Sequence, residues 1–208
     1  MKRLGDISFL SNSVDRYGTD SLCQVLTPPA FIPELTSDSN YVVRMVFKPS
    51  WHSEFVVTLS RKATCFEYSI HSARISLWQF LNWGANPKRV GLLIRDDLLP
   101  PGRWEARGVL DLEKLPGCID HSDAFSEAWH PRVGALQLDG IGVDACRVDR
   151  TGPREFRRPG ATPWKPTAVE FCAAVLSALR ETCADDDANV VLDAGLWYHG
   201  IGERPRDQ

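Results

Sequence analysis

Two closely spaced runs of β-branched and aromatic residues constrain the fold more than any other feature of this 208-residue chain. The first is Tyr41–Phe47 (YVVRMVF), and the second is Phe55–Leu59 (FVVTL). Residues of these kinds favour strands, and the polar connection KPSWHSE between the runs, which contains Pro49, favours a change of chain direction. Together the two runs predict an antiparallel hairpin.

Other segments extend this hairpin into a larger sheet. The segment Cys65–Ile70 alternates apolar and polar residues, which is typical of a strand with one buried face. A turn at 149–153 separates an alternating run at 141–148 from a short returning strand at 154–156. Further strands are predicted at 90–94, 108–112 and 189–192.

The clearest helical pattern spans residues 168–183. Thr167 and Glu170 have the T-x-x-E spacing of a capping box. The residues that recur at helical spacing and form one apolar stripe are Val169, Cys172, Leu176, Leu179 and Cys183. With short helices predicted at 76–84 and 123–129, the expected fold is α+β: a mainly antiparallel sheet with helices packed on one face.

Length and composition favour a single domain over residues 1–208, with an irregular N-terminal arm at 1–40 and a frayed tail at 201–208. No apolar run is long enough to cross a membrane, and the N-terminus lacks the apolar core of a signal peptide. The six cysteines form no CxxC pair and have no zinc-finger spacing, so they are interpreted as free thiols of a cytoplasmic protein.

The net charge of −3 hides an asymmetry along the chain. Residues 105–208 hold 18 acidic and 12 basic side chains, and the segment 181–193 holds five acids and no base. Between acidic stretches, the segment 147–158 is rich in arginine. An acidic surface disfavours nucleic acid as the main ligand and suits a cationic protein partner.

The stretch KPSWHSEF first suggests a serine hydrolase, because it holds Ser50, His52 and Glu54. Alternate residues of an extended strand lie about 7 Å apart, so these three side chains cannot hydrogen-bond in series. No G-x-S-x-G elbow accompanies them. The stretch is therefore interpreted as a polar connection that presents Trp51 and His52 to a partner at one end of the sheet.

A second cluster suggests a metal site. It consists of His121, Asp123, Glu127 and His130, of which the last three share one helix face. Glu-x-x-His is half of a carboxylate-bridged metal site, but no second such pair and no HExxH motif are present. A solvated helix face is the favoured interpretation, with a metal-dependent hydrolase as the alternative. No nucleotide-binding motif is present either, and no cofactor is predicted.

Two regions together resemble a known group of proteins. They are the hairpin YVVRMVFKPSWHSEFVVTLSR (41–61) and the run LDGIGVDACRVDRTGPREFRRP (138–159), followed by the helix AVEFCAAVLSAL (168–179). This order is similar to that of small bacterial proteins related to the immunity proteins of polymorphic and contact-dependent toxin systems.

The resemblance implies a protein that is not an enzyme and that binds and neutralises a cognate toxin. A cationic nuclease is the expected toxin, because the acidic segments would supply a complementary field. The predicted partner contacts are Trp51, His52, Asp185, Asp186 and Asp187. Neither nucleic acid nor membrane is an expected partner, and no oligomeric state is predicted.

Overall fold

The structure is a computed structural model that describes residues 22, 23, 26, 31–49, 52–74, 76, 102–115, 141–158 and 166–203. For residues 154–158 and 166–169 the description is confined to the backbone. Several predicted segments lie outside the described residues: the helices at 76–84 (apart from Ser76) and 123–129, the strand at 90–94, and the tail beyond residue 203.

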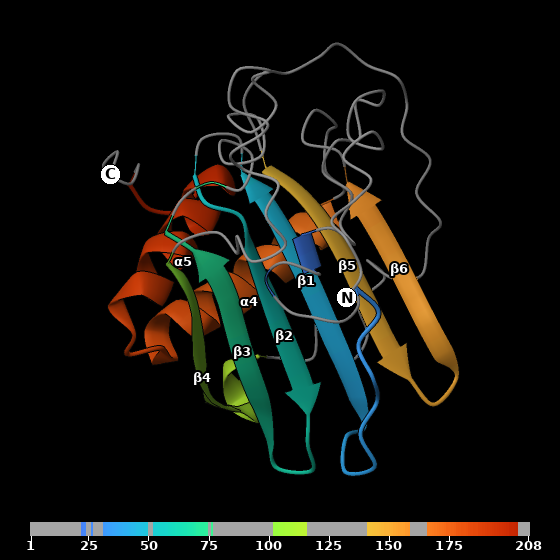
Figure 1. The fold of residues 1–208 in the computed structure, drawn as a ribbon. Helices are drawn as coiled ribbons and strands as arrows, with labels where there is room; N and C mark the ends of the chain where they lie inside the picture. Colours follow the sequence, from blue (N-terminus) through green and yellow to red (C-terminus); the bar gives the residue numbers. More distant parts are fainter. Residues whose placement is uncertain are drawn as a thin grey trace, which may run out of the picture.

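A six-stranded antiparallel sheet forms the centre of the fold (Figure 1). Its strands lie in the order β4-β3-β2-β1-β5-β6. Their bounds are β1 Tyr41–Pro49, β2 Phe55–Arg61, β3 Cys65–Ala73, β4 Arg103–Asp111, β5 Ile141–Asp149 and β6 Gly152–Arg158. A single 3₁₀ turn, η2 at Leu112–Lys114, follows β4, and the helices α4 (Pro166–Thr182) and α5 (Asp186–Tyr198) follow β6.

This architecture confirms the predicted α+β fold and its mainly antiparallel sheet. The predicted hairpin is the pair β1 and β2, in which Met45 is the partner of Val57. The β3 and β4 strands are longer than expected. The extra residues of β4 at 103–107 are mostly charged, which obscures the apolar alternation on which the prediction relied.

The prediction of a strand at 189–192 is wrong, because these residues lie within α5. Asp185 caps this helix: its side chain accepts a hydrogen bond from the Ala188 N–H at 2.8 Å. Asp186 and Asp187 then occupy the first turn, where carboxylates interact favourably with the helix dipole. The buried positions Ala188, Val191, Leu192 and Leu196 have helical spacing. The adjacent valines at 190 and 191 favour a strand, but the Asp185 cap and the helical spacing of the buried residues stabilise a helix instead.

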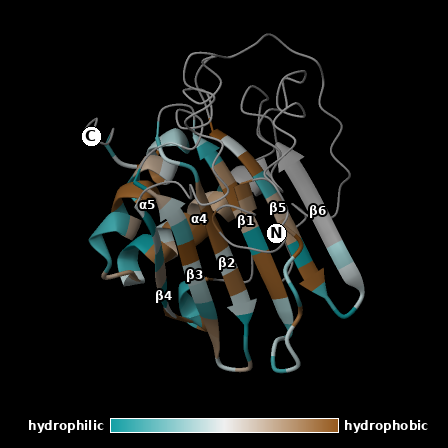
Figure 2. Cartoon of the chain, in the orientation of Figure 1, coloured by the Kyte–Doolittle hydropathy of each residue, from teal (hydrophilic) through white to brown (hydrophobic). Residues whose placement is uncertain are grey.

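One face of the sheet, here called the covered face, packs against α4 and α5 (Figures 1 and 2). Its residues alternate along each strand, as Val43, Met45 and Phe47 do in β1. Phe47 stacks on Phe55 with ring centroids 4.5 Å apart, and both side chains are fully buried. This face forms the main hydrophobic core. Burial of apolar surface there stabilises the fold by about 25 cal/mol per Å².

A glycine brings α5 close to this core. A Cβ atom on Gly195 would lie 3.0 Å from both Phe55 Cζ and Leu176 Cδ1, tighter than ordinary van der Waals contact. The absence of a side chain at residue 195 therefore allows the helix to approach the Phe55 ring directly.

The opposite face is here called the open face, because neither α4 nor α5 lies on it. Part of it is covered by Leu22, Cys23, Leu26 and Phe31, which form a second buried cluster with residues of the strands. The strand residues in that cluster are Val46, Val56, Ala73 and Cys146. Leu22, Cys23 and Leu26 are helical, so the predicted arm is not irregular throughout. Most of the rest of the open face is polar.

The described cysteines are all free, and Cys23, Cys146, Cys172 and Cys183 are buried. Neither of the two described α-helices combines the length and apolar character that a membrane crossing requires.

Candidate binding groove on the open face

A groove with a volume of about 960 Å³ lies on the polar part of the open face. Its floor includes a row of side chains that are Cα partners across four adjacent strands. This polar row consists of Arg44 from β1, Thr58 from β2, Ser69 from β3 and Arg107 from β4. Because neighbouring strands are about 4.8 Å apart, the row places two hydroxyl groups side by side between two guanidinium groups.

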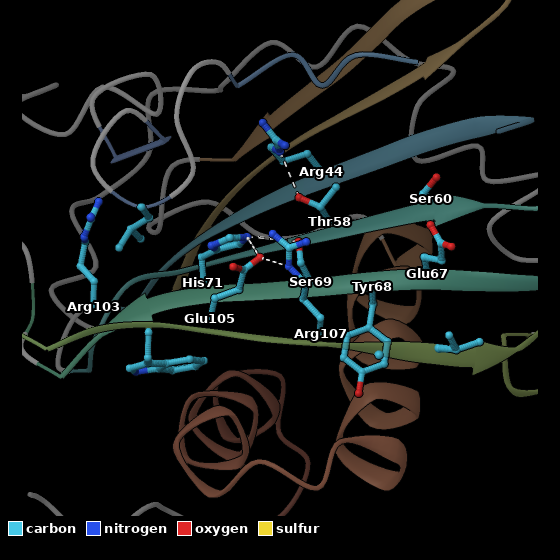
Figure 3. A pocket seen from close by; sticks show the side chains of 14 residues that line it. Arg44, Thr58, Ser60, Glu67, Tyr68, Ser69, His71, Arg103, Glu105 and Arg107 are labelled. Carbon is cyan, nitrogen blue, oxygen red and sulfur yellow. Dashed lines mark hydrogen bonds and ion pairs between the residues drawn. The ribbon is translucent and has the colours of Figure 1, made fainter. Parts of the chain in front are cut away.

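Hydrogen bonds and ion pairs connect the row to its neighbours (Figure 3). Arg44 Nε donates to Thr58 Oγ1 at 3.1 Å. His71 Nε2 lies 3.2 Å from Ser69 Oγ and 3.2 Å from Glu105 Oε1. Arg107 Nε donates to the same oxygen of Glu105. The groove therefore holds a network of polar side chains already in contact with one another.

The contact with Glu105 determines the proton on His71. A carboxylate can only accept hydrogen bonds, so an imidazole nitrogen 3.2 Å from it must carry a hydrogen. Nε2 of His71 is thus assigned as the donor of the hydrogen bond to Ser69 Oγ, with Glu105 Oε1 also 3.2 Å away. A nitrogen that donates cannot accept, so the hydroxyl hydrogen of Ser69 does not point at His71.

Ser69, His71 and Glu105 do not form a catalytic triad, although their residue types match one. In a triad, one imidazole nitrogen faces the nucleophile and the other faces the carboxylate. Here Ser69 and Glu105 both contact Nε2. The imidazole cannot take a proton from Ser69 through a nitrogen that is already protonated, so this cluster lacks an activated nucleophile.

The electrostatics of the groove depend on burial. Burial lowers the pKa of His71 below its ordinary value, and the nearby charges of Arg44, Arg107 and Arg103 act in the same direction. Glu105 opposes them, with a smaller effect than burial. Burial likewise lowers the pKa of Arg44. The groove therefore holds a neutral imidazole and a guanidinium that has lost part of its hydration.

Another hydroxyl group in the groove, that of Ser60, belongs to a separate chain of hydrogen bonds. Thr36 Oγ1 donates to Asp38 at 2.7 Å, so Ser39 must donate to Thr36, and Ser60 must donate to Ser39 at 2.7 Å. The chain ends at a carboxylate that also accepts from Lys62, and this bond lowers the pKa of Asp38 to about 2. The hydroxyl hydrogen of Ser60 is thus already used within the protein.

Of the partner contacts predicted in the connection between β1 and β2, His52 is described, whereas Trp51 and Ser50 lie outside the described residues. His52 Nδ1 lies 3.3 Å from the Tyr198 hydroxyl, and its ring meets Trp197 edge-on. Glu54 is buried and accepts from Ser76 Oγ at 3.3 Å. His52 and Glu54 thus contact residues in different parts of the chain.

The three acidic residues predicted to bind a partner lie at the start of α5. Asp185 and Asp186 are exposed. Asp185 also caps the helix, and Asp187 forms an ion pair with Arg74 at 3.1 Å. Their role in partner binding stays a prediction.

The predicted metal ligands His121, Asp123, Glu127 and His130 lie outside the described residues. Within residues 22–203, as far as they are described, no group of three or more metal-ligating side chains is close enough to hold an ion.

Comparisons of the chain with family models, curated proteins and solved structures gave no match. The groove must therefore be interpreted from its own residues. The sequence analysis did not identify it, although a signal was present: the polar positions Arg44, Thr58 and Ser69 interrupt the outward-facing side of apolar strands. Pairing the strands in register would have placed these side chains together.

Proposed function

We propose that this chain is an immunity protein, which binds a cognate bacterial toxin in the cytoplasm with one-to-one stoichiometry and thereby neutralises it. The observation that carries the proposal is the shared contact of Ser69 and Glu105 with one nitrogen of His71. This arrangement gives a fixed polar surface without an activated nucleophile, which favours binding over catalysis.

The open face supplies the proposed binding surface. Its groove is wide and lined by charged and hydroxyl side chains, including Arg44, Arg103 and Arg107. Arg is one of the residue types that most often dominate the free energy of protein association. A partner that covers the groove would also bury the exposed Val109 at its rim.

The toxin is proposed to be a cationic nuclease. The exposed carboxylates of Asp185 and Asp186 support this choice, because negative charge near an interface accelerates encounter with a cationic partner. These acids would lie outside the groove contact and act at a distance.

The test is a titration of toxin activity with this chain, using a candidate toxin encoded by a neighbouring gene. Because a binding protein is consumed by each toxin molecule, protection should rise linearly and end at an equimolar ratio. A one-to-one complex should elute from size-exclusion chromatography with the matching mass.

Protection at about one hundredth of the toxin concentration would indicate catalytic turnover and would contradict the proposal. Failure to form any complex with a folded, active toxin would contradict it as well.

A further inference from the structure

Two hydroxyl groups in the middle of the polar row have lone pairs in use and hydrogens without a protein acceptor. Thr58 Oγ1 accepts from Arg44 Nε, and Ser69 Oγ contacts the protonated Nε2 of His71. Among the described residues, neither Thr58 nor Ser69 donates to another group. Both hydroxyls are therefore available as donors to a ligand.

The position of these donors defines the kind of ligand. Thr58 and Ser69 are direct cross-strand partners, so their side chains can reach two oxygens of one small group. Arg44 lies at one end of the row and Arg107 at the other, both positively charged. Two neighbouring hydroxyl donors between two guanidinium groups suit a planar anion with two oxygens.

We propose that Thr58 and Ser69, flanked by Arg44 and Arg107, bind a carboxylate group, which is supplied by an acidic side chain of the protein partner. The inference rests on the proposed function, since it names the chemistry by which that partner is recognised.

The charges of the groove favour a carboxylate over the phosphates of a nucleic acid. Three arginines and two glutamates line it, which leaves one excess positive charge when His71 is neutral. A polyphosphate chain needs a run of several cations. Glu105 and Glu67 would repel additional phosphates, whereas a single carboxylate between Arg44 and Arg107 adds less negative charge beside them.

The groove also contains a matched control. Ser60 lies in the same groove, but its hydroxyl donates to Ser39. Removing the Ser60 hydroxyl therefore changes the polarity of the groove without removing a donor available to a ligand.

The experiment follows backbone amide shifts of the full-length protein by NMR during titration with sodium acetate and, separately, sodium phosphate at constant ionic strength. Acetate should cause saturable shifts at residues 57–59 and 68–70. The double variant T58V/S69A should bind acetate at least about tenfold more weakly, because two hydrogen bonds to a charged group are lost. S60A and the hydroxyl-retaining variant T58S should bind acetate as the wild type does.

Equal acetate affinity of the wild type and T58V/S69A would overturn the inference, as would tighter binding of phosphate than of acetate. If the double variant does not fold, the same comparison is made between S69A and S60A.

The same variants are then tested for binding to the toxin. Weaker toxin binding by T58V/S69A than by S60A supports the inference, and equal toxin binding by both overturns it while leaving the proposed function intact. Acetate binding by a protein that forms no toxin complex overturns the proposed function and the protein source of the carboxylate together.

Discussion

The two faces of the sheet are built from the same strands and differ in what their side chains contact. On the covered face, Phe47, Phe55 and Leu59 are fully buried under the two helices. On the open face, Thr58 and Ser69 remain partly accessible and contact polar neighbours. Alternation along a strand thus separates stabilisation from recognition: the covered face contributes to the free energy of folding, and the polar part of the open face, outside its buried cluster, can change with little effect on it.

The largest expected effect breaks the covered face. The substitution Phe55→Ala removes the partner of Phe47 and the contact with α5 at Gly195. It should lower the free energy of unfolding by about 3–5 kcal/mol, because a buried aromatic ring is lost and a cavity remains. Denaturant unfolding followed by circular dichroism measures this loss.

Arg107→Ala is the matched change on the open face. It should lower the free energy of unfolding by less than about 1 kcal/mol, since the side chain is 75% exposed and its ion pair with Glu105 is solvated. Equal losses for Phe55→Ala and Arg107→Ala would show that the two faces do not differ as described.

A smaller effect is expected where Tyr68 of the covered face passes beneath the edge strand. A Cβ atom on Gly108 would lie 2.5 Å from the Tyr68 hydroxyl oxygen, which is too close for any real contact. Gly108→Ala should lower the free energy of unfolding by about 1–3 kcal/mol through overpacking, measured by the same unfolding experiment.

The control is the double variant Y68F/G108A, which should recover part of this loss if the Tyr68 hydroxyl causes the clash. The same hydroxyl is partly buried, and burial raises the pKa of Tyr68 to about 12.

The architecture was largely predictable from the sequence, and the groove was not. The hairpin of β1 and β2 follows from its valines and phenylalanines, which have few alternatives to a buried sheet. The helical identity of α5 depends on the Asp185 cap, a contact between a side chain and a backbone N–H three residues away. The groove depends on register across four strands, since Arg107 lies 63 residues from Arg44 in the numbering and joins the row only through strand pairing.

The smallest expected effect is a pH dependence of the unfolding free energy that comes from His71 on the open face. Because the pKa of His71 is lowered on folding, the unfolded chain binds a proton more readily than the folded protein. The contribution of His71 to stability is therefore complete above about pH 6.5, the pKa of an unfolded histidine, and is lost as the pH falls through the lower folded value. Thermal or denaturant unfolding measures this dependence between about pH 7.5 and about pH 5. This range spans the ordinary histidine pKa of about 6.5.

The control is His71→Gln. It should reduce the fall in unfolding free energy on acidification, because the histidine whose pKa folding lowers is removed. An identical pH dependence of wild type and variant would mean that His71 is not the titrating group.

Two arginine–carboxylate pairs allow the most direct test of the claim that the open face binds the partner. Arg107 on the open face donates through Nε to Glu105, and Arg180 on α4 donates through Nε to Asp193 at 2.6 Å. The measurement is the affinity of the toxin for R107E and for R180E by calorimetry, with circular dichroism to verify folding. The account predicts a loss of at least about tenfold for R107E, equivalent to about 1.4 kcal/mol, and a change below about threefold for R180E. A loss confined to R180E would place the partner on the helices and would contradict the account.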